Sequence, residues 1–452
     1  MVLVAQSGCR KDRFLTTPAS LSFSVDTVYF DTVFTRLPGS GLPRSRNLQL
    51  IVRNTENKSV KTNIRLAGGT ASPFRINIDG MAVNQVSDYE IRANDSVFVF
   101  VECILEANNL TNPAIVLDSL LFNTGGREQD VKLAAYGWDA YYYQDSILPC
   151  NTTWDKTDKP YVIVNSIAVD ENCKLTIKEG VHIYSSSNSK IFILGTLDVQ
   201  GKKDNEVIFQ ADRLQQSYQE RPGQWRGIHF IRESKDNQID YAIIKNATIG
   251  IQVDSLPINA NPNLRISNTI IRNMTNYGIV GLTAKIEAQN CLIHGCGFQN
   301  FAGFFGGDYD VRHCSFYGSA DANNNHIEPV FSINNFLTDG NTIIRTYDVK
   351  YILINNIMHG TLENEVTFSF AQSHPPLPSV FEKNLFRVEK PANFNPANNI
   401  INVNPLFKNP GARDFSLQNG SLAIDSGITA GVAKDINGKT RDASPDLGAY
   451  EF

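Results

Sequence analysis

Charge and long apolar segments are both scarce in this sequence, and each scarcity excludes a class of protein. Charged residues make up 19% of the chain, and 41 Lys and Arg against 46 Asp and Glu leave a net charge of −5. Such a chain has no basic surface to hold a nucleic-acid backbone. No apolar stretch reaches the roughly 18 residues that a membrane-spanning helix needs. The seven cysteines lack the paired C-x-x-C spacing of a zinc site.

What the sequence does contain favours a folded, β-rich protein. Its 452 residues are 42% hydrophobic, which suits two or three domains of roughly 100–200 residues each. Asparagine makes up about a tenth of the chain, and most of it follows residue 150. Asparagine is a poor helix former that suits turns, so a mainly helical fold is disfavoured. The uneven distribution predicts two different architectures.

The first nine residues, MVLVAQSGC, resemble the lipobox of bacterial lipoproteins. In that family the cysteine, here Cys9, becomes the lipidated first residue after cleavage. The resemblance implies a signal remnant, lipobox and tether over residues 1–20. It also implies a lipid-anchored protein of the bacterial outer membrane, on the cell surface or on the periplasmic face. The alternative is an ordinary N-terminal cysteine.

Residues 21–137 contain short alternating apolar runs separated by turn signals, such as Phe74–Ile78 and Asp95–Cys103. About seven short strands in this length are typical of an immunoglobulin-like β-sandwich. Residues 138–160 are expected to form a linker and an N-terminal cap for the next domain.

Four short motifs follow in a characteristic order: Leu175–Val181 (LTIKEGV), Gly195–Leu197 (GTL), Val207–Phe209 (VIF) and Trp225–Ile228 (WRGI). This order resembles the first coils of right-handed parallel β-helix proteins with the pectate-lyase-like fold. A polar residue followed by an apolar core then recurs at irregular intervals, beginning at Tyr241, Asn268, Asn290, His313, Asn356 and Asn384. Coils of about 20–30 residues with inserted loops indicate a solenoid over residues 161–410.

The last segment, residues 411–452, resembles the C-terminal piece of many exported bacterial β-helix proteins. The similarity lies in Ala423-Ile-Asp425, Asp435–Arg441 and Asp446–Glu451. Because a solenoid must close its exposed last coil, this segment is expected to be a cap.

Catalytic residues are harder to identify in this sequence than the fold. Lyases of this fold use a carboxylate cluster for Ca²⁺ with Arg or Lys as the base, and hydrolases use two or three aspartates. The best local candidates are Asp308, Asp310, Arg312 and His313, of which the two aspartates alternate as on one strand face. No Asp-Asp pair, Gly-His-Gly or Arg-x-Lys accompanies them. His313 also falls at the ladder position of Asn268 and Asn290, which favours an internal polar stack.

The remaining cysteines leave two alternatives open. In an exported protein Cys150 and Cys173 can form a disulfide, and buried free thiols are equally consistent with the spacing. His229, beside Trp225, is expected to pack at a coil corner and not to bind a metal.

The sequence therefore favours a non-catalytic binding or scaffold protein of the cell envelope, with no cofactor. Its partner would be an outer-membrane protein complex or a glycan, and its membrane contact would be the lipid anchor alone. Loops 211–224, 318–347 and 367–379 are the candidates for partner contacts. The alternative is a polysaccharide lyase or glycoside hydrolase acting on an acidic polysaccharide, with Ca²⁺ required in the lyase case.

Overall fold

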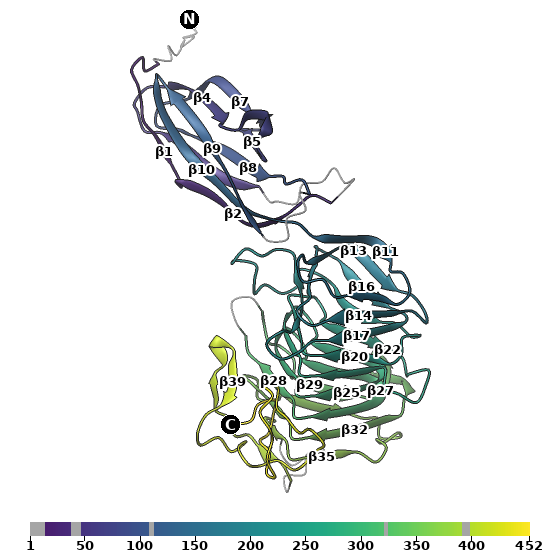
Figure 1. The fold of residues 1–452 in the computed structure, drawn as a ribbon. Helices are drawn as coiled ribbons and strands as arrows, with labels where there is room; N and C mark the ends of the chain where they lie inside the picture. The colour runs from purple at the N-terminus through teal and green to yellow at the C-terminus, as the bar shows by residue number, and fades with distance from the viewer. Residues whose placement is uncertain (1–13, 38–46, 108–112, 321–323, 391–397) are drawn as a thin grey trace, which may run out of the picture. The chain divides into compact units, whose positions relative to one another are not determined.

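The chain folds as an all-β protein with two units, one within residues 1–140 and one within residues 141–452. The computed structural model describes residues 14–37, 47–107, 113–320, 324–390 and 398–452 (Figure 1). Cys9, which the resemblance predicts to be lipidated, lies outside the described residues. In the described residues no helix has the length and apolar character needed to cross a membrane.

The N-terminal unit is a β-sandwich of two five-stranded sheets. The first sheet has the order β1 (Leu21–Phe23), β3 (Leu48–Asn54), β8 (Ser96–Cys103), β5 (Phe74–Ile78) and β6 (Met81–Val83). The second has the order β2 (Thr27–Phe34), β10 (Arg127–Trp138), β9 (Ala114–Thr124), β4 (Val60–Leu66) and β7 (Gln85–Ile91). Neighbouring strands are antiparallel except β2 and β10, which are parallel. A short 3₁₀ turn, η1 (Gly69–Ala71), precedes β5.

Alternation of side chains builds the core of this sandwich. Along β4 every second residue is buried, from Val60 to Leu66. Because successive side chains of a strand point to opposite faces, this pattern buries one face of the sheet and exposes the other. Phe30, Phe74 and Phe122 are buried together in the resulting core.

The second unit is a parallel β-helix, and the predicted fold class is confirmed for both units. Its strands stack in parallel into three ladders, which we call A, B and C in the order in which each coil visits them. Figure 1 shows β14, β17 and β20 stacked in order, with β32 and β35 further along.

The strands β11 (Tyr141–Ile147) and β13 (Tyr161–Val169) begin ladders B and C. Ladder A consists of β12 (Thr152–Trp154), β14 (Lys174–Lys178), β17 (Thr196–Gln200), β20 (Asn237–Asp240), β23 (Leu264–Ser267), the second halves of β25 (Ile279–Gln289) and β27 (Phe301–Arg312), β32 (Val349–Ile354) and β35 (Val380–Glu382). Ladder B consists of β15 (His182–Ser185), β18 (Val207–Ala211), β21 (Ala242–Lys245), β24 (Ile270–Met274), β26 (Leu292–Cys296), β28 (Ser315–Gly318), β33 (Ile357–Gly360), β36 (Leu385–Phe386) and β37 (Ile400–Ile401). Ladder C consists of β16 (Lys190–Ile193), β19 (Gly227–Phe230), β22 (Ile251–Asp254), the first halves of β25 and β27, β29 (Phe331–Asn334) and β34 (Val366–Ser369). A hairpin of β30 (Phe336–Asp339) and β31 (Thr342–Thr346) lies in an insertion between β29 and β32.

The corner between ladders A and B explains part of the asparagine content. Asn268, Asn290, His313 and Asn355 follow ladder A strands and have φ of 50°, 50°, 50° and 60°. Asparagine tolerates this left-handed conformation, which turns the chain sharply. The Asn290 side-chain amide also donates to the Asn268 side-chain oxygen at 3.1 Å. Polar residues at this corner therefore have a structural role: they turn the chain and hydrogen-bond between coils.

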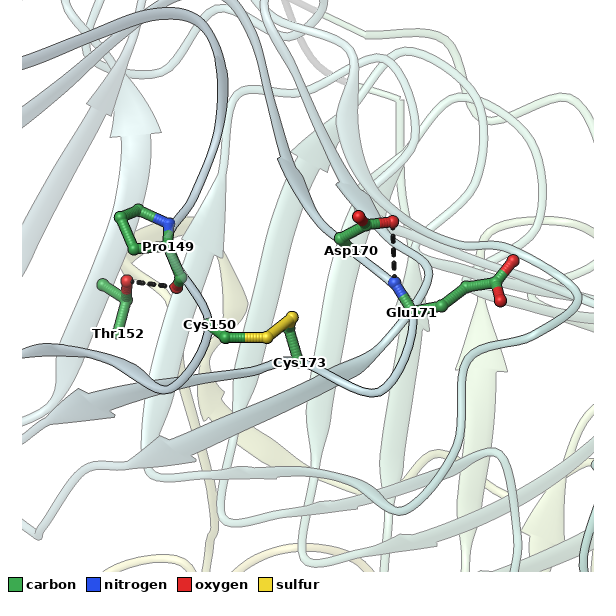
Figure 2. The surroundings of a disulfide bond; sticks show 6 residues. All are labelled: Pro149, Cys150, Thr152, Asp170, Glu171 and Cys173. Atoms are coloured by element: carbon green, nitrogen blue, oxygen red, sulfur yellow. Dashed lines mark hydrogen bonds between the residues drawn. A yellow bond between two sulfur atoms is a disulfide. The ribbon is translucent and has the colours of Figure 1, made fainter.

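A disulfide joins Cys150 and Cys173 in the first coils of the β-helix (Figure 2). The two Cα atoms are 4.6 Å apart, within the usual range for a disulfide. Each cysteine lies beside a hydrogen-bonded turn: Thr152 Oγ1 donates to the Pro149 carbonyl, and the Glu171 amide donates to Asp170 Oδ1. In the described residues Cys291, Cys296 and Cys314 are buried free thiols, and Cys103 is buried in the sandwich.

The C-terminal segment lies along the flank of ladder B. It contains β38 (Phe407–Asn409), the 3₁₀ turn η4 (Pro410–Ala412) and β39 (Asp414–Leu417). Apolar residues of the segment form one buried cluster with outward residues of ladder B: Leu292, Ile357 and Leu385 pack with Phe407, Phe415, Leu417, Ala423, Ile436, Leu447 and Ala449. The sequence predicted a cap over the last coil, whereas these contacts run along the side of several coils.

Candidate functional site

The outward face of ladder A carries a continuous polar stripe. Equivalent positions on successive coils are Thr176, Asp198, Gln238, Arg265, Glu287 and Asp310. Strand alternation directs these side chains to solvent while neighbours such as Ile286 and Val311 fill the core. Stacked strands lie about 4.8 Å apart, so the stripe places polar groups at regular intervals along the solenoid.

Toward the C-terminal end of this face is a hollow of about 170 Å³. It is lined by residues of three consecutive coils: Lys285, Ile286 and Glu287 from β25, Asp308 and Asp310 from β27, and Lys350 and Ile352 from β32. Lys285, Asp308 and Lys350 are register partners, as are Glu287 and Asp310. The hollow therefore combines three carboxylates with two ammonium groups.

The three carboxylates differ in how they are held. Arg312 binds Asp310 with two parallel hydrogen bonds, Nε to Oδ1 at 2.6 Å and Nη2 to Oδ2 at 2.7 Å. This pairing raises the pKa of Arg312 and fixes both oxygens of Asp310. Arg265 Nε donates to Glu287 Oε2 at 2.9 Å, and Lys285 Nζ lies 4.0 Å from Asp308 Oδ2. The Glu287 and Asp308 side chains remain 33% and 34% exposed, which leaves both open to a ligand.

The structure brings together three of the four predicted site residues. Asp308, Asp310 and Arg312 alternate on the outward face of β27, as the sequence suggested. His313 is buried at the corner instead, because its φ of 50° ends the alternation of the strand. Its Nδ1 lies 3.1 Å from the Asp446 carbonyl oxygen, and Asn355 Nδ2 donates to its Nε2 at 2.8 Å. Burial first, and then Arg441, lower the pKa of His313 to about 3, so the ring is a neutral structural group.

Sequence reasoning missed Lys285 and Lys350. Lys350 follows the insertion that carries β30 and β31, so its register with Asp308 is hidden until the coils are stacked. The available signal was the strand pattern of Val349–Ile354, which resumes the coil after that insertion.

A second, larger hollow of about 630 Å³ lies on the same face. Its polar lining residues are Asp155, Lys178, Glu179, Gln200, Lys202, Gln238 and Asp240. Lys202 Nζ binds Glu179 Oε1 at 2.6 Å, and Ser267 Oγ donates to Asp240 Oδ1 at 2.8 Å. Both hollows thus display carboxylates and lysines, and the larger hollow adds the amides of Gln200 and Gln238.

Ladder C carries a different polar pair. His229 Nε2 and Asp254 Oδ2 are 2.6 Å apart, and Gln252 Nε2 donates to Asp254 Oδ1 at 2.9 Å. Burial raises the pKa of Asp254, but the hydrogen bonds from His229 and Gln252 outweigh it and lower the pKa overall. His229 points outward from β19 and does not pack at a corner as expected. Its Nδ1 is shielded from solvent and its Nε2 faces Asp254, so the His229 ring is less accessible than the Glu287 and Asp308 carboxylates.

In the described residues no group of three or more His, Cys, Asp or Glu side chains is arranged to hold a metal ion.

Comparison with known proteins adds little. No protein-family model matches the chain, and no curated protein matches its sequence. Among solved structures, the catalytic unit of a GH87 α-1,3-glucanase from Streptomyces thermodiastaticus is 11% identical with a TM-score of 0.32, over 75% of this chain and 68% of that one. The Agl-KA catalytic domain is 9% identical with a TM-score of 0.23, over 75% and 78% of the two chains. The Escherichia coli chaperone DraB is 11% identical with a TM-score of 0.19, over 28% of this chain and 56% of that one. All three TM-scores are below 0.5, so none of these similarities carries an argument about function.

Proposed function

We propose that the β-helix binds an acidic polysaccharide along ladder A and cleaves it at the hollow between β25 and β32. The observation that carries the proposal is the convergence of Glu287 and Asp308, both accessible, with Lys285 and Lys350 around one hollow. Lysines attract the acidic groups of such a glycan, and a pair of carboxylates is the usual machinery of glycoside hydrolysis.

The shape of ladder A favours an extended polymer over a small ligand. The stripe from Thr176 on β14 to Asp310 on β27 spans five steps of about 4.8 Å, roughly 24 Å in all. Its two hollows lie on the same face, separated by the Arg265 and Ser267 coil. A chain of sugar units can therefore occupy both hollows at once, and hydroxyl groups suit the exposed amide and carboxylate side chains.

The spacing of the carboxylates assigns roles in the cleavage step. Glu287 and Asp308 lie diagonally, one coil and two residues apart, so the strand dimensions put their Cα atoms about 8 Å apart. A similar separation is expected for the two carboxyl groups, because both side chains point outward from the same face. That value falls in the range of roughly 6.5–9.5 Å at which inverting glycosidases hold their acid and base. One of the two would protonate the leaving oxygen while the other activates water. Asp310, whose oxygens are both bound by Arg312, would orient the substrate.

The test is a cleavage and binding assay on a panel of acidic polysaccharides. Wild-type protein is expected to release reducing ends, and Glu287→Gln and Asp308→Asn are each expected to lower the rate by at least about 10²-fold, the usual contribution of a general acid or base. Glu171→Gln, an exposed glutamate outside both hollows, is the matched control. Unchanged rates in both hollow variants would contradict the catalytic assignment. Unsaturated products would show elimination in place of hydrolysis and would refute the inverting mechanism.

This proposal follows the alternative that the sequence left open, and not its favoured non-catalytic scaffold. From the sequence, the β27 residues with Glu287 on the preceding coil were too few to indicate an active site, whereas stacking also brings Lys285 and Lys350 to them.

We also propose that the protein acts at the bacterial outer membrane, held by lipid on Cys9. Support comes from the lipobox resemblance of residues 1–9. Metabolic labelling with a fatty-acid analogue should modify the full-length precursor and fail with Cys9→Ala. Protease accessibility on intact cells then distinguishes the outer surface from the periplasmic face.

A further inference from the structure

Three distant segments bring basic side chains together on the outward face of ladder B. Lys245 on β21 and Arg272 on β24 are register partners on adjacent coils. Arg413, from the C-terminal segment, and Glu220, from the loop of residues 212–226 between β18 and β19, reach the same place. We call Lys245, Arg272, Arg413 and Glu220 the basic cluster.

One carboxylate, that of Glu220, binds both arginines of the basic cluster and is the acidic member of the cluster. Glu220 Oε2 accepts hydrogen bonds from Arg272 Nη1 and the Asn273 side-chain amide, and Arg413 Nη2 lies 2.8 Å from it. Asp414, the acidic neighbour of Arg413, is instead hydrogen-bonded to Ser416. Three positive charges and one negative charge leave a surplus of two positive charges in a protein whose net charge is −5.

Burial makes this surplus of positive charge energetically unfavourable. The Arg272 side chain is 15% exposed, and burial lowers the pKa of both Arg272 and Lys245. Repulsion from neighbouring cations of the cluster adds to the effect, and Glu220 opposes it. Like charges in a partly dry site repel strongly, so a further anion would stabilise the cluster.

One wall of the site is apolar and uncharged. His294 is the next residue in register after Arg272, and its ring centroid lies 4.7 Å from that of Phe415. Burial, together with Arg272 and Arg413, lowers the pKa of His294 to about 3, so it adds no charge. Tyr317 packs against the same phenyl ring at 5.3 Å. Such a wall excludes water and strengthens any ion pair formed beside it.

We propose that the basic cluster is a binding site for a divalent oxyanion, a sulfate or phosphate group, which replaces the Glu220 carboxylate between Arg272 and Arg413. Two guanidinium groups and the Asn273 amide supply the planar forks and donors that such a group requires. Glu220 occupies the site as an internal anion on a loop, and a ligand with two negative charges neutralises the cluster more fully. The site lies on ladder B, so it is independent of the cleavage proposed for ladder A.

Calorimetric titration with inorganic sulfate and inorganic phosphate tests the proposal on the full chain. Glu220→Gln is expected to tighten binding by about tenfold, because it removes the competing charge, and Arg413→Gln to weaken it by about tenfold. Arg232→Gln, an exposed arginine of the same β-helix, is the matched control and should leave affinity unchanged. A circular-dichroism melt of each variant verifies folding, and because Glu220→Gln is predicted to gain affinity, misfolding cannot mimic the result.

A sulfated oligosaccharide and its desulfated counterpart then identify the source of the group. Binding of the sulfated form alone assigns the site to a glycan ester, whereas binding of inorganic ions without the oligosaccharide assigns it to a free ion. The proposal is overturned if none of these probes binds, if Glu220→Gln does not tighten binding, or if Arg413→Gln behaves like Arg232→Gln.

Discussion

Glu287 and Asp310 are direct neighbours on consecutive coils, yet each is held by a different arginine. Arg265 holds one oxygen of Glu287, whereas Arg312 holds both oxygens of Asp310. Two adjacent carboxylates would repel each other, and a separate guanidinium for each offsets this repulsion. The arrangement keeps a dense row of acidic groups on one surface and still leaves Glu287 accessible.

Replacing Arg312 tests whether Asp310 must be held in place. In Arg312→Lys the bidentate pairing is lost while the positive charge remains. We expect a roughly tenfold fall in polysaccharide cleavage, because Asp310 is no longer oriented toward the hollow. Steady-state kinetics measure the effect. An unchanged rate in a folded variant would show that the orientation of Asp310 is irrelevant.

The stereochemistry of the product tests the diagonal pairing of Glu287 with Asp308. A separation near 8 Å leaves room for a water molecule, so the anomeric configuration should invert. Proton NMR during the first turnovers distinguishes the two anomers before they equilibrate. Retention of configuration would instead point to a closer pair, such as Glu287 and Asp310.

The disulfide between Cys150 and Cys173 should stabilise the first coils. Removing a crosslink over 23 residues is expected to cost about 3 kcal/mol of unfolding free energy. Urea denaturation of the Cys150→Ala/Cys173→Ala variant, compared with wild type under oxidising conditions, measures this loss. A matched Cys103→Ala variant, which removes a buried thiol of the sandwich, controls for losing a cysteine as such. Equal denaturation midpoints for wild type and the double variant would contradict the prediction.

His313 should make stability depend on pH. Its pKa is about 3 in the folded protein against an ordinary 6.5, so the unfolded chain binds a proton more readily. Above pH 6.5 His313 is neutral in both states and does not lower the free energy of unfolding. As the pH falls from 6.5 toward 3, protonation of the unfolded chain lowers that free energy progressively. At pH 5 the loss is about 2 kcal/mol, at about 1.4 kcal/mol per pH unit.

The variant His313→Asn isolates that contribution. Asparagine suits the φ of 50° at this corner, as Asn268 and Asn290 show. We expect the variant to lose less stability than wild type between pH 7 and pH 5, measured by urea denaturation at both values. Identical pH dependence in the two proteins would refute the role assigned to His313. The other histidines whose pKa is lowered, His182, His294 and His359, stay in both proteins and cancel in the comparison.

The fold was predictable because its signals are local. The motif Leu175–Val181 and the recurring polar residue at each corner lie within single coils, and the sequence displays them directly. Even the burial of His313 followed from its alignment with Asn268 and Asn290. Short-range pattern is enough to recognise a solenoid, since every coil repeats the same alternation.

The sites were less predictable because they depend on which coils are adjacent. Lys350 is the register partner of Asp308 only because the insertion containing β30 and β31 leaves the stack of coils. Arg413 meets Arg272 across more than a hundred residues, through a C-terminal segment expected to lie elsewhere. No periodicity within one coil carries information about either contact.

Packing of the C-terminal segment on ladder B also sets an order for burial of this flank. The apolar residues Leu292, Ile357 and Leu385 are covered by side chains that are synthesised after them, from Phe407 to Ala449. During synthesis or export, the earlier coils can stack while this strip stays uncovered and available to chaperones or to other chains. A proteolytic cut before Phe407 would expose the strip of Leu292, Ile357 and Leu385 again, so an intact segment after residue 406 is needed to keep this flank of ladder B buried.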